Sequence, residues 1–426
     1  MAGSERREAM DAMNEKTATK SLAGNAVFSV IYRLLNILFP MISYGYVAHV
    51  LTSEGVGRHA ASANNVSYFV ILGSLGIQAY ATREIARRRD DKKARDKLFS
   101  EMLIVNALLT SFAIVVFMIC WMFVPLFRDE KMLYLICAIA IVTNFINVDW
   151  YFQGTEDFKF IAIRSFIVKA LSLAAIFLLI RTSDDLYKYA LICVFANGAN
   201  HLLNVIRACR SARFQLRGTS LRPHIRSLVF LALCTVSTEL YARMDITMLD
   251  IMDKHSTVAY YSSAQKIITM AVTTVIAITA VFLPRLSYYY ENDRKEFKRL
   301  TKLGTKMMTF LSIPMCLGII ALSYPLISVW LGPEYTDAVP CLIILAFMIP
   351  LKSIGDIVCY QVMMCAGREF YLMIACMITL GVNFVNNLIL IPRYGAFGAS
   401  AASLISEIIV FVIVFVESRK YLVEAA

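Results

Sequence analysis

Charged residues and histidine are scarce in this chain. Only 17 % of its 426 residues are Asp, Glu, Lys or Arg, and only five are histidine. The sequence contains no GxxxxGK[ST], HExxH or GxSxG motif, and every polar connection is shorter than about 25 residues. These absences leave no nucleotide site for an ATP-driven pump and no loop large enough to fold as a catalytic domain. We therefore expect neither enzymatic activity nor a cofactor.

The ten cysteines lack the spacing of a disulfide or metal framework. No CxxC motif occurs, and most of the cysteines lie inside apolar runs. A free cysteine in such a run behaves as a small buried hydrophobic residue. The sequence therefore predicts no metal site and no disulfide scaffold.

Long apolar runs are what the chain has instead. It is 58 % hydrophobic, and the stretches 60–82, 102–127 and 370–391 carry no charge. Because a helix of about 20 apolar residues crosses the hydrocarbon core of a bilayer, these stretches indicate an all-α membrane protein. We predict about twelve transmembrane helices, at 22–48, 60–80, 99–126, 132–152, 159–180, 187–206, 227–250, 257–284, 303–331, 338–364, 370–391 and 395–416.

The basic residues fall on every second connection. Counted over the connections and tails, 28 Lys and Arg lie on one side and seven on the other. Such an excess marks the cytoplasmic face, so we expect both termini to be cytoplasmic. The polar segment 1–20 has no apolar core of a signal peptide and is predicted to be a disordered cytoplasmic tail. The net charge of +11 is interpreted as membrane-surface charge, which gives no indication of nucleic-acid binding.

Two short similarities suggest an internal repeat. Gly154-Thr155-Glu156 matches Gly367-Arg368-Glu369, and 61–64 (ASAN) matches 262–265 (SSAQ), in each case about half a chain apart. Parallel repeats in transporters pack about an axis along the membrane normal and enclose a central cavity. We expect a first lobe at 21–210 (helices 1–6), a basic linker at 211–226, a second lobe at 227–418 (helices 7–12) and a cytoplasmic tail at 419–426.

Seven basic residues lie inside the predicted spans, where each costs roughly 2.5–3.5 kcal/mol on insertion scales. They should face a wet cavity or a partner, although Arg164 and Lys306 lie near span ends and can snorkel. The first span carries a polar stripe at helical spacing: Asn25, Ser29, Arg33, Asn36, Pro40 and Ser43. Such a stripe lines a cavity or, alternatively, joins helices.

The cations and amides of the spans form the predicted substrate site. Guanidinium and ammonium groups in a partly dry cavity suit a phosphate or diphosphate, and amides suit sugar hydroxyls or hold helices together. The predicted cavity cations are Arg33, Lys169, Arg164, Arg243 and Lys266. The predicted cavity amides are Asn36, Asn64, Gln78, Asn144 and Asn147.

Acidic residues concentrate in the second half. Glu239 with Arg243, and Lys352 with Asp356, are spaced i,i+4 and are expected to neutralise each other within one helix. The acids of this half suit a coupling cation, and the candidates are Glu239, Asp245, Asp356 and Glu407. In the first half, Arg33, Arg164 and Lys169 face only Asp149, so we expect about two uncompensated positive charges there.

The run 386–400 (NNLILIPRYGAFGAS) resembles a signature of the polysaccharide-biosynthesis (Wzx-type) flippases. The segments 331–335 (LGPEY) and 150–156 (WYFQGTE) are similar to two other signatures of that family. The resemblance spans essentially the whole chain and implies the fold of the multidrug/oligosaccharidyl-lipid/polysaccharide exporters. The lipid II flippases of that superfamily carry two further helices, which we do not expect after Val416.

The resemblance also implies a function. A Wzx-type flippase moves undecaprenyl-diphosphate-linked oligosaccharides across the bacterial inner membrane, and we expect ion-coupled alternating access with no covalent chemistry. The expected partners are this lipid-linked substrate, the bilayer and the polymerase or chain-length proteins of polysaccharide synthesis. Two alternatives stay open at this point: a multidrug exporter of the same fold, and a membrane-embedded glycan polymerase or ligase.

Overall fold

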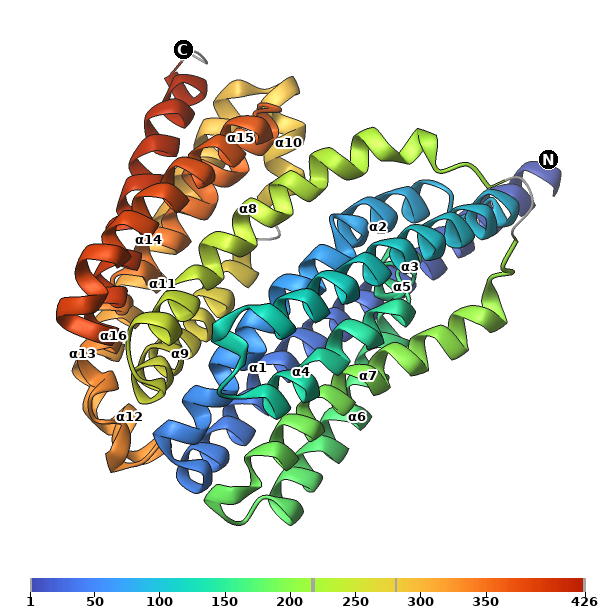
Figure 1. The fold of residues 1–426 in the computed structure, drawn as a ribbon. Coiled ribbons are helices and arrows are strands. Elements are labelled where there is room, and N and C mark those ends of the chain that lie inside the picture. The colour runs from blue at the N-terminus through green and yellow to red at the C-terminus, as the bar shows by residue number, and fades with distance from the viewer. Residues whose placement is uncertain (1, 216–218, 280–281, 424–426) are drawn as a thin grey trace.

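The structure is a bundle of helices (Figure 1). This computed structural model describes the backbone of residues 2–215, 219–279 and 282–423. Within these ranges it describes the side chains of Leu35 and of all residues from Leu38 onward, apart from Cys234 and Val423. The described residues form helices and short connections, with no strand among them. The backbone of residues 2–20 forms the beginning of helix α1, and the side chains of this segment are not described. The predicted disorder of the tail at 1–20 stays a prediction.

Nine helices of the described part are long and apolar enough to cross a membrane. Two of them, at Leu38–Arg87 and Glu369–Leu422, have 50 and 54 residues and are each long enough to cross twice. The backbone reverses inside each, at Thr52 with φ of 63° and at Gly395 with φ of 53°. A shorter apolar helix lies at Lys131–Ile146. The chain is a multi-pass membrane protein of about twelve transmembrane helices in two six-helix lobes, as predicted.

The helices of the first lobe are α1 (Ala2–Ser74), α2 (Ile77–Arg87), α3 (Lys92–Phe123), α4 (Lys131–Thr143), α5 (Asp149–Gly154), α6 (Phe158–Leu179) and α7 (Leu186–Ser211), with the short turns η1 (Pro125–Phe127), η2 (Asn144–Ile146) and η3 (Ser183–Asp185).

The helices of the second lobe are α8 (Arg222–Met252), α9 (His255–Thr279), α10 (Phe282–Asn292), α11 (Arg294–Ala321), α12 (Ser323–Trp330), α13 (Ala338–Ala346), α14 (Met348–Gly355), α15 (Val362–Cys365) and α16 (Glu369–Val423), with the turn η4 (Pro333–Tyr335) and the π-helix η5 (Asp356–Gln361).

One predicted span is interrupted in the structure, and another contains a change of helix type. The fourth span, predicted at 132–152, ends as an α-helix at Thr143, passes through η2, and has an extended residue at Asn147 before α5. The tenth span, predicted at 338–364, is one apolar helical segment at Ala338–Cys365, in which α13, α14, the π-helix η5 and α15 follow one another. The α-helix of the fourth span is therefore shorter than predicted, and Asn144 at its end takes part in contacts with α3.

The two ends of the bundle differ in how the lobes meet. We call the end with the connections 83–97 and 285–302 the basic end, and the end with the reversals at Thr52 and Gly395 the opposite end. One apolar cluster contains Val47 and Leu133 of the first lobe together with Leu249 and Leu342 of the second. Its members gather toward the opposite end. Toward the basic end the clusters are separate for each lobe, except that Leu228 of α8 joins the first-lobe cluster.

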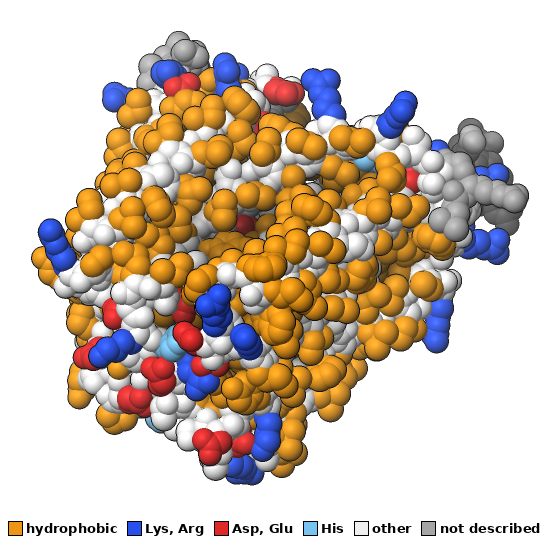
Figure 2. All heavy atoms as spheres, in the orientation of Figure 1, with side chains coloured by type: hydrophobic (Ala, Val, Ile, Leu, Met, Phe, Trp, Pro, Cys, Tyr) orange, Lys and Arg blue, Asp and Glu red, His pale blue; other side chains and the backbone are white. Residues whose placement is uncertain are grey.

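The surface agrees with a bilayer environment. Figure 2 shows a broad belt of hydrophobic side chains, with Lys, Arg, Asp and Glu gathered at the two ends of the bundle. Large apolar side chains such as Phe310 and Val329 are 78 % exposed, which is costly in water but favourable in lipid.

Candidate substrate cavity

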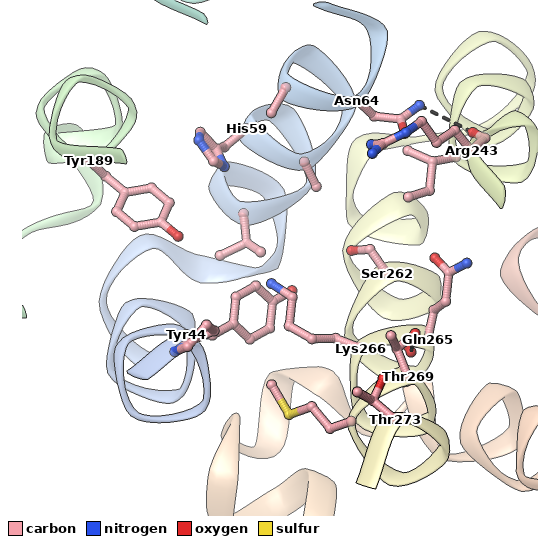
Figure 3. A pocket seen from close by; sticks show the side chains of 16 residues that line it. Tyr44, His59, Asn64, Tyr189, Arg243, Ser262, Gln265, Lys266, Thr269 and Thr273 are labelled. Atoms are coloured by element: carbon pink, nitrogen blue, oxygen red, sulfur yellow. Dashed lines mark hydrogen bonds between the residues drawn. The ribbon is translucent and has the colours of Figure 1, made fainter. Parts of the chain in front are cut away.

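A cavity of about 690 Å³ lies between the lobes. Helix α1 and the start of α7 line it from the first lobe, and α8 and α9 line it from the second (Figure 3). A neighbouring cavity of about 250 Å³ extends into the first lobe between α1, α6 and α7. The two share the lining residues Pro40, Tyr44, Tyr189 and Lys266. We treat them as one central cavity.

Lys266 is the cation at the centre of this cavity. Its Nζ lies 3.4 Å from the ring centroid of Tyr44, across the boundary between the lobes (Figure 3). The Tyr44 hydroxyl in turn shares a 2.8 Å hydrogen bond with Ser263 Oγ of α9. A cation–π contact partly compensates an ammonium group without neutralising it. Lys266 therefore keeps its positive charge available to a ligand.

Arg243 lines the cavity from α8, on the side of Asn64. Its Nε donates to Glu239 Oε2 at 2.8 Å, which confirms this predicted pair. Asn64 donates to the carbonyl oxygen of Arg243 at 3.2 Å and to Thr247 Oγ1 at 2.9 Å (Figure 3). Arg243 and Glu239 are both more than one third exposed, so the guanidinium can exchange its partner for a ligand.

Lys169 lines the first-lobe part of the cavity from α6. Its Nζ donates to the carbonyl oxygen of Leu35 at 3.2 Å. The predicted cavity residues Arg33 and Asn36 lie outside the described side chains, so their positions stay predictions. Of the same polar stripe, Pro40 and Ser43 do line the cavity.

Arg164 is placed elsewhere. It is 5 % exposed, and its Nη1 donates to Asp149 Oδ1 at 2.9 Å and to the carbonyl oxygen of Asn200 at 3.4 Å. Asn204 also donates to Asp149. The lining residues of the central cavity do not include Arg164. The guanidinium of Arg164 is paired inside the first lobe with a carboxylate 15 positions earlier in the chain.

Three of the predicted amides hold helices together or lie away from the cavity. Asn144 is 2 % exposed and donates to Thr110 Oγ1 of α3 at 3.0 Å. Asn147 donates to Asn144 Oδ1 at 3.3 Å, and its carbonyl oxygen accepts from Trp150. Gln78 lies in α2, and the lining residues of the central cavity do not include it. Only Asn64 of the described amides in the prediction lines this cavity.

The predicted pairing of Lys352 with Asp356 was wrong. Lys352 Nζ lies 2.9 Å from Glu407 Oε2 of α16, whereas Asp356 Oδ2 accepts from Thr279 at 2.6 Å and from Gln361 at 2.9 Å. The i,i+4 spacing failed because partners distant in sequence come closer. Both groups line a second cavity of about 930 Å³, which is lined mostly by apolar side chains of the second lobe and also by Ala79 and Arg83 of α2.

Asp245 accepts hydrogen bonds from several elements of the second lobe. It is 4 % exposed and accepts from Tyr261, Ser403 and Asn387, each at 2.6 Å. These three donors come from α9 and from both halves of α16. They hold the second lobe together around one carboxylate.

Several cavity residues were missed by sequence reasoning. Tyr44, His59 and Tyr189 line the cavity, and the rings of His59 and Tyr189 lie 4.7 Å apart. An isolated aromatic residue in an apolar run gives no signal of its own. Gln265 could have been found, because the internal repeat pairs it with Asn64, and both line the cavity from opposite lobes.

Below the cavity, toward the opposite end, polar contacts close the gap between the lobes. We call this set of contacts the seam. Ser53 donates to Glu334 Oε1 from its backbone N at 2.9 Å and from its Oγ at 2.6 Å. The Tyr335 hydroxyl donates to the carbonyl oxygen of Thr52 at 3.2 Å. The 331–335 motif therefore serves to join the lobes.

The deeper part of the seam surrounds Asp250. Asn65 donates to Asp250 Oδ2 at 2.8 Å and accepts from Thr247 Oγ1 at 2.9 Å. The backbones also approach closely: a Cβ on Gly57 would lie 1.8 Å from the carbonyl oxygen of His255. No other residue fits at that point without moving the lobes apart.

Comparisons with known proteins agree with this arrangement. The family model described as polysaccharide biosynthesis protein matches residues 22–290. The chain belongs to this family. The model described as lipid II flippase MurJ matches the overlapping residues 158–424.

Individual proteins are similar over nearly the full length. A candidate O-antigen transporter of Escherichia coli (strain K12) is 22 % identical over 413 residues, which are 95 % of this chain and 98 % of that protein. The solved structure of the lipid II flippase MurJ in an inward closed conformation has a TM-score of 0.73 at 16 % identity, covering 94 % of this chain and 89 % of that one. The inward-facing structure of a multidrug resistance MATE family transporter also has a TM-score of 0.73, at 14 % identity, covering 93 % and 98 %.

Proposed function

We propose that this protein flips undecaprenyl-diphosphate-linked oligosaccharide units across a bacterial inner membrane for surface polysaccharide synthesis. The central cavity carries this proposal, because it combines the cations Lys266, Arg243 and Lys169 with amides and aromatic rings. Cations suit the diphosphate, and amides and aromatic rings suit the sugars. The family membership and the similarity to a candidate O-antigen transporter support the same reading.

The proposed mechanism is alternating access without covalent chemistry. The head group enters the central cavity from the basic end, while the polyprenyl tail stays in the lipid around the apolar belt. The lobes then close at the basic end and separate at the seam. We propose that a coupling cation acts through the second-lobe acids Glu239, Asp245, Asp356 and Glu407.

The proposed orientation has both termini in the cytoplasm, with the basic end facing it. The basic excess on alternate connections supports this, and Figure 1 shows both chain ends at the basic end. Reporter fusions after Glu101 and Asp293 should read cytoplasmic, and fusions after Ser53 and Asp129 should read outside. Reversed signals would overturn the orientation.

Polymerase and chain-length proteins are the proposed partners in the membrane.

Lys266 is the residue that tests the substrate site. Lys266→Ala should abolish glycan export in a complementation assay and weaken binding of undecaprenyl diphosphate to the purified protein about tenfold or more, since a charge-assisted hydrogen bond contributes roughly 1.5–3 kcal/mol. Lys266→Arg should retain part of both. Lys306→Ala is the matched control, because Lys306 is exposed on α11 and should behave like the wild type.

The second candidate function is export of organic cations. The match to the MATE transporter at the same TM-score as MurJ favours it. The three described cavity cations argue against it, because like charges repel. Export of a cationic dye that survives Lys266→Ala, together with unchanged binding of undecaprenyl diphosphate, would favour the multidrug function over the flippase.

A further inference from the structure

The buried acids of the second lobe differ in which lobe holds them. A proton or ion can drive the lobes only if it binds their two arrangements with different free energies. The hydrogen-bond and ion-pair partners described above for Asp245, Asp356 and Glu407 all belong to the second lobe. Separation of the lobes does not by itself break these contacts. A carboxylate held from both lobes would instead lose partners directly.

Asp250 is held from both lobes. It lies near the end of α8, and its side chain is 2 % exposed. Asn65 of α1 donates to its Oδ2 at 2.8 Å, and the Tyr134 hydroxyl of α4 makes a longer contact of 3.5 Å. Asn65 and Tyr134 are themselves joined by a 3.0 Å hydrogen bond and are buried. The first lobe therefore presents a preorganised pair of donors to this carboxylate.

We propose that Asp250 is a proton-binding site that couples protonation to opening of the seam. The ionised carboxylate accepts charge-assisted hydrogen bonds from the first lobe, and these are about twice as strong as neutral ones. A proton on Asp250 removes that charge and weakens the attachment of the lobes. The proposal rests on the proposed function, in which the lobes alternate, and it names the ligand and the residue through which the seam responds.

Charged groups near Asp250 affect how readily its carboxylate binds a proton. His255 Nδ1 lies 3.2 Å from Asp250 Oδ1 and belongs to the same lobe. Glu54 and Glu130 of the first lobe act electrostatically on His255, and Arg58 is paired with Glu130. An imidazolium on His255 disfavours a proton on Asp250. His255→Gln should therefore shift seam opening to higher pH.

Hydrogen–deuterium exchange on the full-length protein in lipid nanodiscs, without substrate, tests the proposal. Exchange of the segments 49–57 and 331–337 is followed between pH 6 and pH 4, where an Asp carboxyl begins to bind a proton, and is corrected for intrinsic rates. In the wild type, protection of both segments should fall as the pH falls. Asp250→Asn should show low protection at both pH values. Asp157→Asn, whose ion pair with Arg207 lies within the first lobe, should retain the wild-type response.

The outcomes separate a specific site from general damage. Tyr134→Phe keeps the carboxylate and removes one first-lobe donor, so it should lower seam protection only partly. A wild-type pH response that survives in Asp250→Asn would overturn the proposal, and so would equal loss of response in Asp157→Asn. If the seam responds as expected while undecaprenyl diphosphate does not bind the wild type, the proposed substrate fails and the proton site stands.

Discussion

The two lobes hold their buried charges in different ways. In the first lobe a guanidinium is buried against a carboxylate, as Arg164 with Asp149. In the second lobe a buried carboxylate, Asp245, is held by hydroxyl and amide donors. Of the three described cavity cations, only Lys169 comes from the first lobe. The number of charged residues inside the spans of a lobe therefore does not predict how many of them line the cavity.

The largest expected effect in this comparison is at the first-lobe pair. Asp149→Ala leaves Arg164 buried without its carboxylate, which should destabilise the fold by about 3–5 kcal/mol. The variant Asp149→Ala/Arg164→Leu removes both charges and should recover most of that loss. Thermal melting and folded yield in detergent measure both. An equally unstable double variant would mean that the pair contributes through its packing rather than its charge.

An intermediate effect is expected at the second-lobe pair. Lys352→Met removes the cation that pairs with the carboxylate of Glu407, which is 7 % exposed. The free energy of unfolding should fall by about 1–3 kcal/mol. Adding Glu407→Gln should restore stability, whereas adding Asp356→Asn should not, because Lys352 pairs with Glu407 in the structure. The melting temperatures of the two double variants decide between these partners. Recovery with Asp356→Asn instead would reinstate the pairing suggested by the i,i+4 spacing.

The smallest effect on stability is expected at the half-exposed pair in the cavity. Glu239→Gln frees Arg243 and should change stability by only about 0.3–0.5 kcal/mol, as measured for exposed i,i+4 pairs. Because the guanidinium loses its competitor, binding of undecaprenyl diphosphate to the purified protein should become tighter. Weaker binding would show that Glu239 itself contacts the ligand.

The fold was predictable because its cause is local. Uncharged runs such as 102–127 exceed the bilayer thickness wherever they lie in the fold, so the spans and the two lobes follow from the sequence. The repeat also identified Asn64 and Gln265 as equivalent positions. Helix breaks were less predictable, because the interruption after Thr143 depends on contacts that Asn144 makes with α3.

The site was only partly predictable because its contacts are distant in sequence. The partner of Lys352 lies 55 positions later at Glu407, and no spacing rule within one helix indicates it. Asp250 and Asn65 are 185 positions apart, and each reads alone as an ordinary residue near a span end. Which face of a helix meets the other lobe requires the three-dimensional structure.

The reversal at Thr52 has a practical consequence for labelling this protein. Leu51 and Ser53, on either side of Thr52, are 1 % and 4 % exposed. The chain therefore turns back without an exposed loop to which a protease or an antibody could bind. An epitope inserted there would separate Ser53 from Glu334. The exposed connection between Asn292 and Asp293 at the basic end is a better insertion site. Affinity tags and binding proteins for imaging should be directed to that face.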